Sequence, residues 1–76
     1  MTFEKVRDMI AEQLQVDAAS ITRESRLVED LRADSANVMV MILELETEFG
    51  LEVEDEVILN LKTVGDVVDY IDKQQG

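Results

Sequence analysis

Hydrophobic residues recur at helical spacing in three stretches of the chain. In the central stretch, residues 35–49, the intervals between apolar residues are three, one, three and four positions, which is typical of one buried helix face: Val38, Met41, Ile42, Leu45 and Phe49. Asp34 precedes this stretch and is a favourable N-cap, because its carboxylate can accept backbone N–H groups of the first turn. Gly50 is the expected stop. The pattern therefore predicts a central helix with Ser35 at its first position.

The same spacing predicts helices on either side of the central one. A first helix over residues 3–15 carries the stripe Phe3, Val6, Ile10 and Leu14, and Thr2 can cap it. A last helix carries the stripe Val64, Val67, Val68 and Ile71. It follows a sequence from Thr63 to Asp66 that is similar to a capping box, with Asp in place of the usual Glu. Asp55 could cap a short helix that carries Val57, Ile58 and Leu61.

The segment from residue 16 to residue 34 has no sustained periodicity. A loop of this length in so small a chain needs anchors, because unstructured loops beyond about 12–15 residues are uncommon. We expect its aliphatic residues to enter the core: Val16, Ile21, Leu27, Val28 and Leu31. The predicted fold is all-α, a small four-helix bundle with three longer helices, one short helix and a long first loop, formed as a single domain by residues 1–76.

Composition narrows the possible functions. The net charge of −11 disfavours nucleic acid and anionic membrane surfaces as partners, and favours proteins with basic patches. The chain has no Cys and no His, which removes disulfides, structural zinc and every Ser-His or Cys-His catalytic arrangement. A core this thin makes a deep active site hard to build, so we do not expect an enzyme.

Two further expectations concern location and assembly. The longest apolar run, residues 38–43, is far shorter than the roughly 20 residues that cross a bilayer, and the first residues show no signal-peptide pattern. We therefore expect a cytoplasmic protein without a membrane span. We also expect a monomer.

Metal binding is not expected from the acidic residues. With Asp30 as the first position of a calcium loop, Ser35 stands where Gly is needed and Met41 where Glu is needed. The acidic residues at 52 and 54–56 could hold a divalent ion loosely, but a solvated loop is the better interpretation. Ser35 itself, taken alone, is most simply a first-turn residue.

The segment around Ser35 resembles the attachment motif of the acyl carrier proteins. The residues from Val28 to Asn37, VEDLRADSAN, are similar to the family's V-E-D-L-G-A-D-S-L-D, and the resemblance runs from about Phe3 to Ile71. The resemblance implies that Ser35 bears 4′-phosphopantetheine, taken from coenzyme A by a phosphopantetheinyl transferase (holo-carrier-protein synthase), and that the arm carries acyl groups as thioesters for fatty acid or related synthesis. It implies that Asp34 contacts the transferase besides capping the helix. A phosphodiester would suit a helix N-terminus, where N–H groups and the helix dipole favour an anion.

The resemblance also implies partner and cargo surfaces. Acyl-loading and acyl-processing enzymes with basic patches are the expected partners, and the residues expected to meet them are Ala36, Asn37, Val40, Leu43, Glu44, Glu46 and Glu48. Space for an acyl group is expected between helices, with Ile42, Leu45, Val57, Leu61 and Val67 as candidate lining residues.

Four departures from the family motif leave alternatives open. Ala36 replaces the usual Leu, Arg32 replaces Gly, and Asn37 and Val40 stand at positions that are usually acidic. Met39, Val40 and Leu43 lie off the inner stripe, so they form either an exposed partner site or a surface that the first loop buries. The alternatives to a housekeeping carrier are a specialised polyketide or aminoacyl carrier, and an unmodified acidic interaction module.

Overall fold

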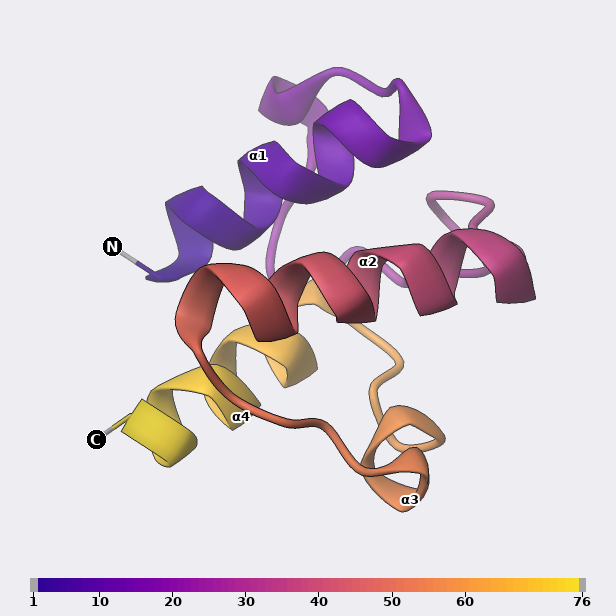
Figure 1. Cartoon of the computed structure of the whole chain (residues 1–76). Helices are drawn as coiled ribbons and strands as arrows, with labels where there is room; N and C mark the ends of the chain where they lie inside the picture. The colour runs from indigo at the N-terminus through magenta and orange to yellow at the C-terminus, as the bar shows by residue number, and fades with distance from the viewer. Residues whose placement is uncertain (1, 76) are drawn as a thin grey trace.

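The chain folds into a bundle of helices around one hydrophobic core (Figure 1). The computed structural model describes residues 2–75, except for the side chain of Ser35. Its elements are α1 (Thr2–Leu14), the 3₁₀ turn η1 (Ala18–Ser20), α2 (Ser35–Phe49), α3 (Asp55–Ile58) and α4 (Val64–Gln75). Within residues 2–75 there is no strand, and the residues 26 and 63 form an isolated bridge. The predicted all-α bundle, with three longer helices, a short one and a long first loop, is confirmed.

The three longer helices supply most of the core through the predicted stripes. α1 packs against both α2 and α4, and α2 runs between α1 on one side and α3 and α4 on the other in Figure 1. The buried residues of these helices are Val6, Ile10, Met41, Ile42, Leu45, Val64, Val67, Val68 and Ile71. Each fully buried side chain of this kind stabilises the fold by about 1.5–3 kcal/mol, so these stripes fix the position of α2.

The long first loop is anchored as expected, with one exception. Ile21, Leu27 and Leu31 are buried, and Val16 packs against the edge of the core. Val28, however, is 64% exposed, so its prediction as an anchor is wrong. Leu27 faces inward and donates its N–H to the carbonyl of Lys62 at 2.9 Å, and the chain then turns, which directs the next side chain to the surface.

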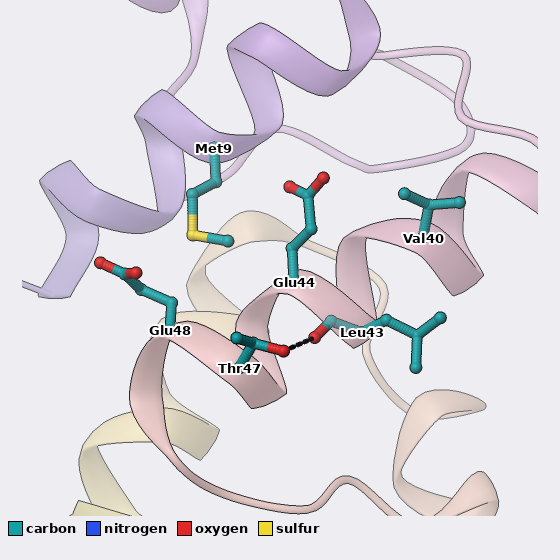
Figure 2. Close-up of a pocket in the computed structure, with 6 residues that line it drawn as sticks. All are labelled: Met9, Val40, Leu43, Glu44, Thr47 and Glu48. Carbon is teal, nitrogen blue, oxygen red and sulfur yellow. Dashed lines mark hydrogen bonds between the residues drawn. The ribbon is translucent and has the colours of Figure 1, made fainter.

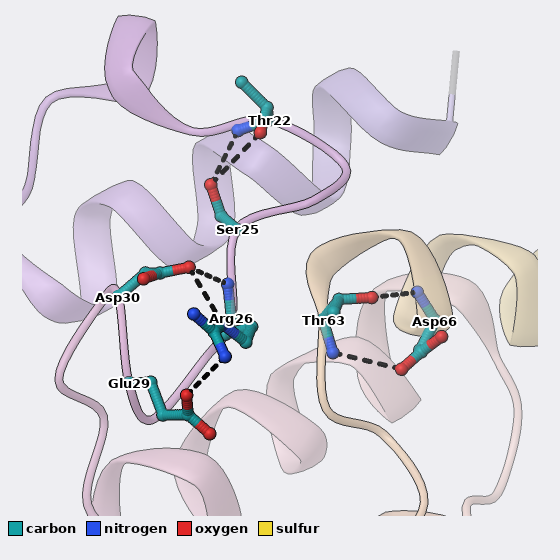
Figure 3. Close-up of polar contacts among 7 residues, drawn as sticks. All are labelled: Thr22, Ser25, Arg26, Glu29, Asp30, Thr63 and Asp66. Atoms are coloured by element: carbon teal, nitrogen blue, oxygen red, sulfur yellow. Dashed lines mark hydrogen bonds and ion pairs between the residues drawn. The ribbon is translucent and has the colours of Figure 1, made fainter.

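A backbone hydrogen bond attaches this loop to the start of α4, and side-chain hydrogen bonds order each of the two segments (Figure 3). The buried Ser25 hydroxyl accepts the Thr22 N–H at 2.9 Å, and the Ser25 carbonyl accepts the Val64 N–H at 3.0 Å. At the start of α4, Asp66 accepts the Thr63 N–H and the Thr63 hydroxyl accepts the Asp66 N–H, both at 3.1 Å. The predicted capping box is therefore confirmed.

Two residues predicted as caps, Thr2 and Asp55, are instead the first described residues of their helices. Glu54 is the N-cap of α3 and makes no side-chain cap hydrogen bond, whereas Asp55 is the first helical residue. The short helix ends at Ile58, so Leu61 lies beyond it. Thr2 lies inside α1, and its hydroxyl donates to Asp72 at 2.6 Å, which joins the ends of α1 and α4.

Candidate functional site at the start of α2

Asp34 holds the first turn of α2 in a reciprocal cap. Its backbone is extended, with φ −94° and ψ −179°, and its carboxylate accepts the Asn37 N–H at 2.8 Å. The Asn37 side-chain oxygen accepts the Asp34 N–H at 3.5 Å, and the Asp34 carbonyl accepts the Val38 N–H at 2.9 Å. The predicted N-cap is present, and the arrangement fixes where α2 begins.

Ser35 is the first residue of α2, as the sequence predicts. Its side chain lies outside the part of the chain that the structure describes. The backbone nevertheless defines its surroundings: the helix dipole places a partial positive charge at this end, and helix geometry leaves first-turn N–H groups without intrahelical partners. Ala36, the next residue, is exposed and small. The charge of a phosphodiester on Ser35 would therefore suit this helix start.

The residues before the cap are held rigidly. Leu31 and Ala33 are buried, and their N–H groups donate to the carbonyls of Arg26 at 3.0 Å and Leu27 at 2.9 Å. Arg32, between them, has φ +59°, in the left-handed region that favours glycine. Arg32 stands at the position where the family motif has Gly.

An exposed apolar strip runs along α2, away from the core. Met39 is 48% exposed, Val40 is 40% exposed and Leu43 is 58% exposed. The first loop does not bury these residues, so that interpretation of the strip is wrong, and its role as a partner site stays a prediction. Val40 and Leu43 line a groove of about 480 Å³ together with Met9 of α1. Figure 2 shows Met9 reaching from α1 toward α2, with Glu44 and Glu48 beside it.

The acidic residues of α2 differ in what they can contact. Glu44 and Glu48 are exposed and line the groove. Glu46 is half-buried, and its carboxylate accepts the Val53 N–H at 2.8 Å, so it holds the loop that follows α2. Glu46 is therefore less available to partners than Glu44 and Glu48, and its contact with partners stays a prediction. Asn37 is half-buried and acts in the cap.

A second pocket, of about 640 Å³, lies between the first loop and the segment that follows α3. Its apolar walls come from Leu27, Val28, Val38, Ile58, Leu59 and Leu61. Val38 is three residues after Ser35 and therefore on the same helix face. Of the five candidate acyl-lining residues, Leu61 lines this pocket; Ile42, Leu45 and Val67 are in the closed core, and Val57 is half-buried on α3.

Two residues that contribute to these surfaces are not predicted from the sequence. Leu59 is 77% exposed on the rim of the second pocket, opposite the first loop that carries Val28. Met9 completes the groove beside α2. One signal was available for Leu59: a helix of one turn cannot direct both Ile58 and its neighbour into a core.

Other kinds of site find no support in residues 2–75. No group of three or more Cys, His, Asp or Glu residues within the described residues could hold a metal ion. None of the helices described is long and apolar enough to cross a membrane.

Comparison with known proteins identifies the family to which the chain belongs. The family model described as a phosphopantetheine attachment site matches residues 4–71. The chain belongs to the acyl carrier protein family. It is 42% identical to an acyl carrier protein of Thermotoga maritima, over 97% of this chain and 91% of the relative. It is 49% identical to one of Clostridium acetobutylicum, over 93% of this chain and 92% of the relative.

Solved structures agree with the sequence relatives. A putative acyl carrier protein from Mycobacterium tuberculosis superposes with a TM-score of 0.91 at 34% identity, covering 97% of this chain and 99% of that one. The acyl carrier protein from Enterococcus faecalis gives a TM-score of 0.80 at 41% identity, covering 92% of this chain and 89% of that one. Acyl carrier proteins are carriers and not enzymes; they hold acyl groups on a covalent 4′-phosphopantetheine arm and work with partner enzymes, usually in fatty acid synthesis.

Proposed function

We propose that Ser35 is the attachment residue and that residues 1–76 act as a single acyl-carrier domain. The observation that carries the proposal is the position of Ser35 directly after a doubly hydrogen-bonded cap, at the first position of α2. This position lies inside the matched segment 4–71. The chain has no Cys, so a thiol for thioester chemistry has to come from an attached group.

The chain's own residues have simple roles in attachment. The Ser35 hydroxyl forms a new P–O bond and loses its proton, while the pyrophosphate bond of coenzyme A breaks and adenosine 3′,5′-bisphosphate leaves. A transferase supplies the catalytic groups and Mg²⁺. Asp34 keeps the turn in place, and its carboxylate offers a contact for the transferase. The bound arm supplies the thiol that holds the acyl group.

Partner enzymes are proposed to dock on the groove between α1 and α2. Its floor is apolar through Met9, Val40 and Leu43, and its rim is acidic through Glu44 and Glu48. The partner surface that complements it carries an apolar side chain within a basic patch. The charges steer the encounter, because exposed ion pairs are each worth only about 0.2–1 kcal/mol, and apolar contact adds affinity.

The second pocket favours an apolar acyl cargo. Six of its lining residues are aliphatic, and the other five are polar or charged: Arg26, Glu29, Lys62, Thr63 and Asp66. The aliphatic part includes Val38, on the same helix face as Ser35, and it supports a fatty acyl or polyketide cargo, because burial there removes apolar surface from water. We therefore propose a role among cytoplasmic acyl-chain enzymes, and the family match disfavours an unmodified interaction module.

The attachment proposal is tested by intact mass after incubation with coenzyme A, Mg²⁺ and a broad-specificity phosphopantetheinyl transferase. The matched control is Ser20→Ala, because Ser20 is an exposed serine at the end of η1, outside α2. We expect the wild type and Ser20→Ala to gain one phosphopantetheine and Ser35→Ala to gain none. A Ser35→Ala protein that folds and still gains the arm would overturn the proposal.

The docking proposal is tested with the loaded protein and a fatty acid synthase condensing enzyme. Leu43→Glu removes apolar contact at the groove and adds a charge that a basic patch tolerates, whereas Ala19→Glu adds the same charge at an exposed residue of η1, outside both pockets. We expect Leu43→Glu to raise KM for the carrier and Ala19→Glu to leave it within twofold. Equal effects would contradict docking at the groove.

A further inference from the structure

Arg32 has an unusual backbone conformation that its neighbours impose. It has φ +59°, and both adjacent residues, Leu31 and Ala33, are buried and hydrogen-bonded to the first loop. Arg32 itself is exposed. Its backbone is therefore fixed, and its side chain starts from a defined point on the surface just before the cap of α2.

The carboxylates nearest to Arg32 in sequence are already occupied. Asp30 accepts the backbone N–H of Arg26 at 2.9 Å and lies 3.5 Å from the Arg26 guanidinium. Asp34 accepts the Asn37 N–H. Arg32 forms no ion pair with any residue that the structure describes, although the net charge of the chain is −11.

The other arginines behave differently. Arg7 pairs with Asp8 at 3.0 Å, Arg23 pairs with Asp69 at 2.7 Å, and Arg26 pairs with Glu29 and Asp30. The unpaired guanidinium within residues 2–75 is thus the one that lies three residues before Ser35. This unpaired positive charge therefore lies close in sequence to the proposed attachment residue.

We propose that Arg32 is the counter-ion of the phosphodiester that attachment creates on Ser35. This inference rests on the proposed function. Three residues span at most about 11 Å along the backbone, and Arg32 is exposed, so its long side chain can reach toward a phosphate attached at Ser35. A guanidinium is suited to phosphate oxygens because it offers paired N–H donors in a plane.

The pairing answers a local electrostatic problem. Attachment adds a negative charge on the residue that follows Asp34 in sequence, in a chain that is already strongly acidic. First-turn N–H groups offset part of that repulsion. Arg32 offsets more of it, and it restricts the direction in which the arm leaves the helix.

The test is a cycle that compares unmodified and phosphopantetheine-bearing protein for the wild type, Arg32→Gln and Arg32→Lys. The equilibrium constant for urea unfolding is measured for each form at low ionic strength. The strain at φ +59° is the same before and after attachment, so it cancels in the comparison. Lys73→Gln is the matched control, because it removes an exposed cation at the far end of the bundle, in the last turn of α4.

We expect attachment to favour folding about 1.5- to fivefold more in the wild type than in Arg32→Gln, the range of an exposed ion pair. The difference should shrink at high salt, Arg32→Lys should retain part of it, and Lys73→Gln should equal the wild type. The Arg32 Nε–H resonance should also shift on attachment. Complete attachment by mass with no difference between the wild type and Arg32→Gln would overturn this inference alone. Absence of attachment would overturn the proposed function and this inference together.

Discussion

Replacing Asp34 by Ala should separate the structural role of the cap from its role in attachment. The substitution removes the acceptor for the Asn37 N–H, a 2.8 Å bond at the start of α2. Loss of an N-cap costs about 1 kcal/mol, within a range of about 0.5–2 kcal/mol. In a domain of this size that free energy lowers the midpoint of thermal unfolding by roughly 4–8 °C.

Asp34→Asn is the control that retains the cap. Asn caps helices about as well as Asp, and salt screens the small interaction of the Asp charge with the helix dipole. We expect Asp34→Asn to unfold near the wild-type temperature and Asp34→Ala to unfold several degrees lower, as measured by circular dichroism. An unchanged midpoint in Asp34→Ala would refute the assigned cap.

The attachment rate of the same variants tests the second role. If the carboxylate contacts the transferase, Asp34→Asn loses rate while its fold is intact. If the cap alone matters, Asp34→Asn is loaded at the wild-type rate and Asp34→Ala is slowed. The pair of variants therefore assigns the contribution of Asp34 to one cause or the other.

Three further changes test particular parts of the fold by urea unfolding. Arg32→Gly should stabilise the unmodified protein by about 1 kcal/mol, because glycine adopts a positive φ without the steric strain of a side chain; a destabilised variant would show that Arg32 is not strained. Gly65→Ala should destabilise by about 1–3 kcal/mol, because the new Cβ would lie 3.0 Å from the Arg23 carbonyl oxygen, and wild-type stability would show that the loop yields there. The pKa of Asp66 lies below its ordinary 3.8, chiefly because its carboxylate accepts the Lys62 N–H and, to a smaller extent, the Thr63 N–H. The stability that this carboxylate contributes is therefore present above about pH 4 and is lost as the pH falls through the pKa of Asp66 in the folded protein. Wild type should consequently lose more stability than Asp66→Asn between neutral pH and pH 3, and parallel losses would contradict the bond.

The helices and their caps were predictable because they depend on local pattern. The stripes on α1, α2 and α4 have the spacing of one helix face, and that face is what the core buries. The hydrogen bonds of both caps, at Asp34 and at Thr63–Asp66, join residues that are three positions apart in the sequence. The positive φ of Arg32 lies at the position where the family motif has Gly, so the motif marks this position even though its conformation was not predicted from the sequence.

What could not be predicted depends on contacts between distant segments. Val28 is exposed because Leu27 takes the inward position when it bonds to Lys62. Glu46 is engaged because the chain after α2 folds back to bring the Val53 N–H to it. The groove beside α2 needs Met9 of α1, and the second pocket needs Leu59 and Val28 on separate loops.

The central claim is that Ser35 carries the arm, and mapping the modified residue tests it most directly. The wild-type protein, purified after incubation with coenzyme A, Mg²⁺ and the transferase, is cleaved and its peptides are fragmented by mass spectrometry. We expect the added phosphopantetheine to be found on Ser35, in a peptide that also contains Asp34. A modification found instead on Ser20 or Ser25, with Ser35 unmodified, would contradict it.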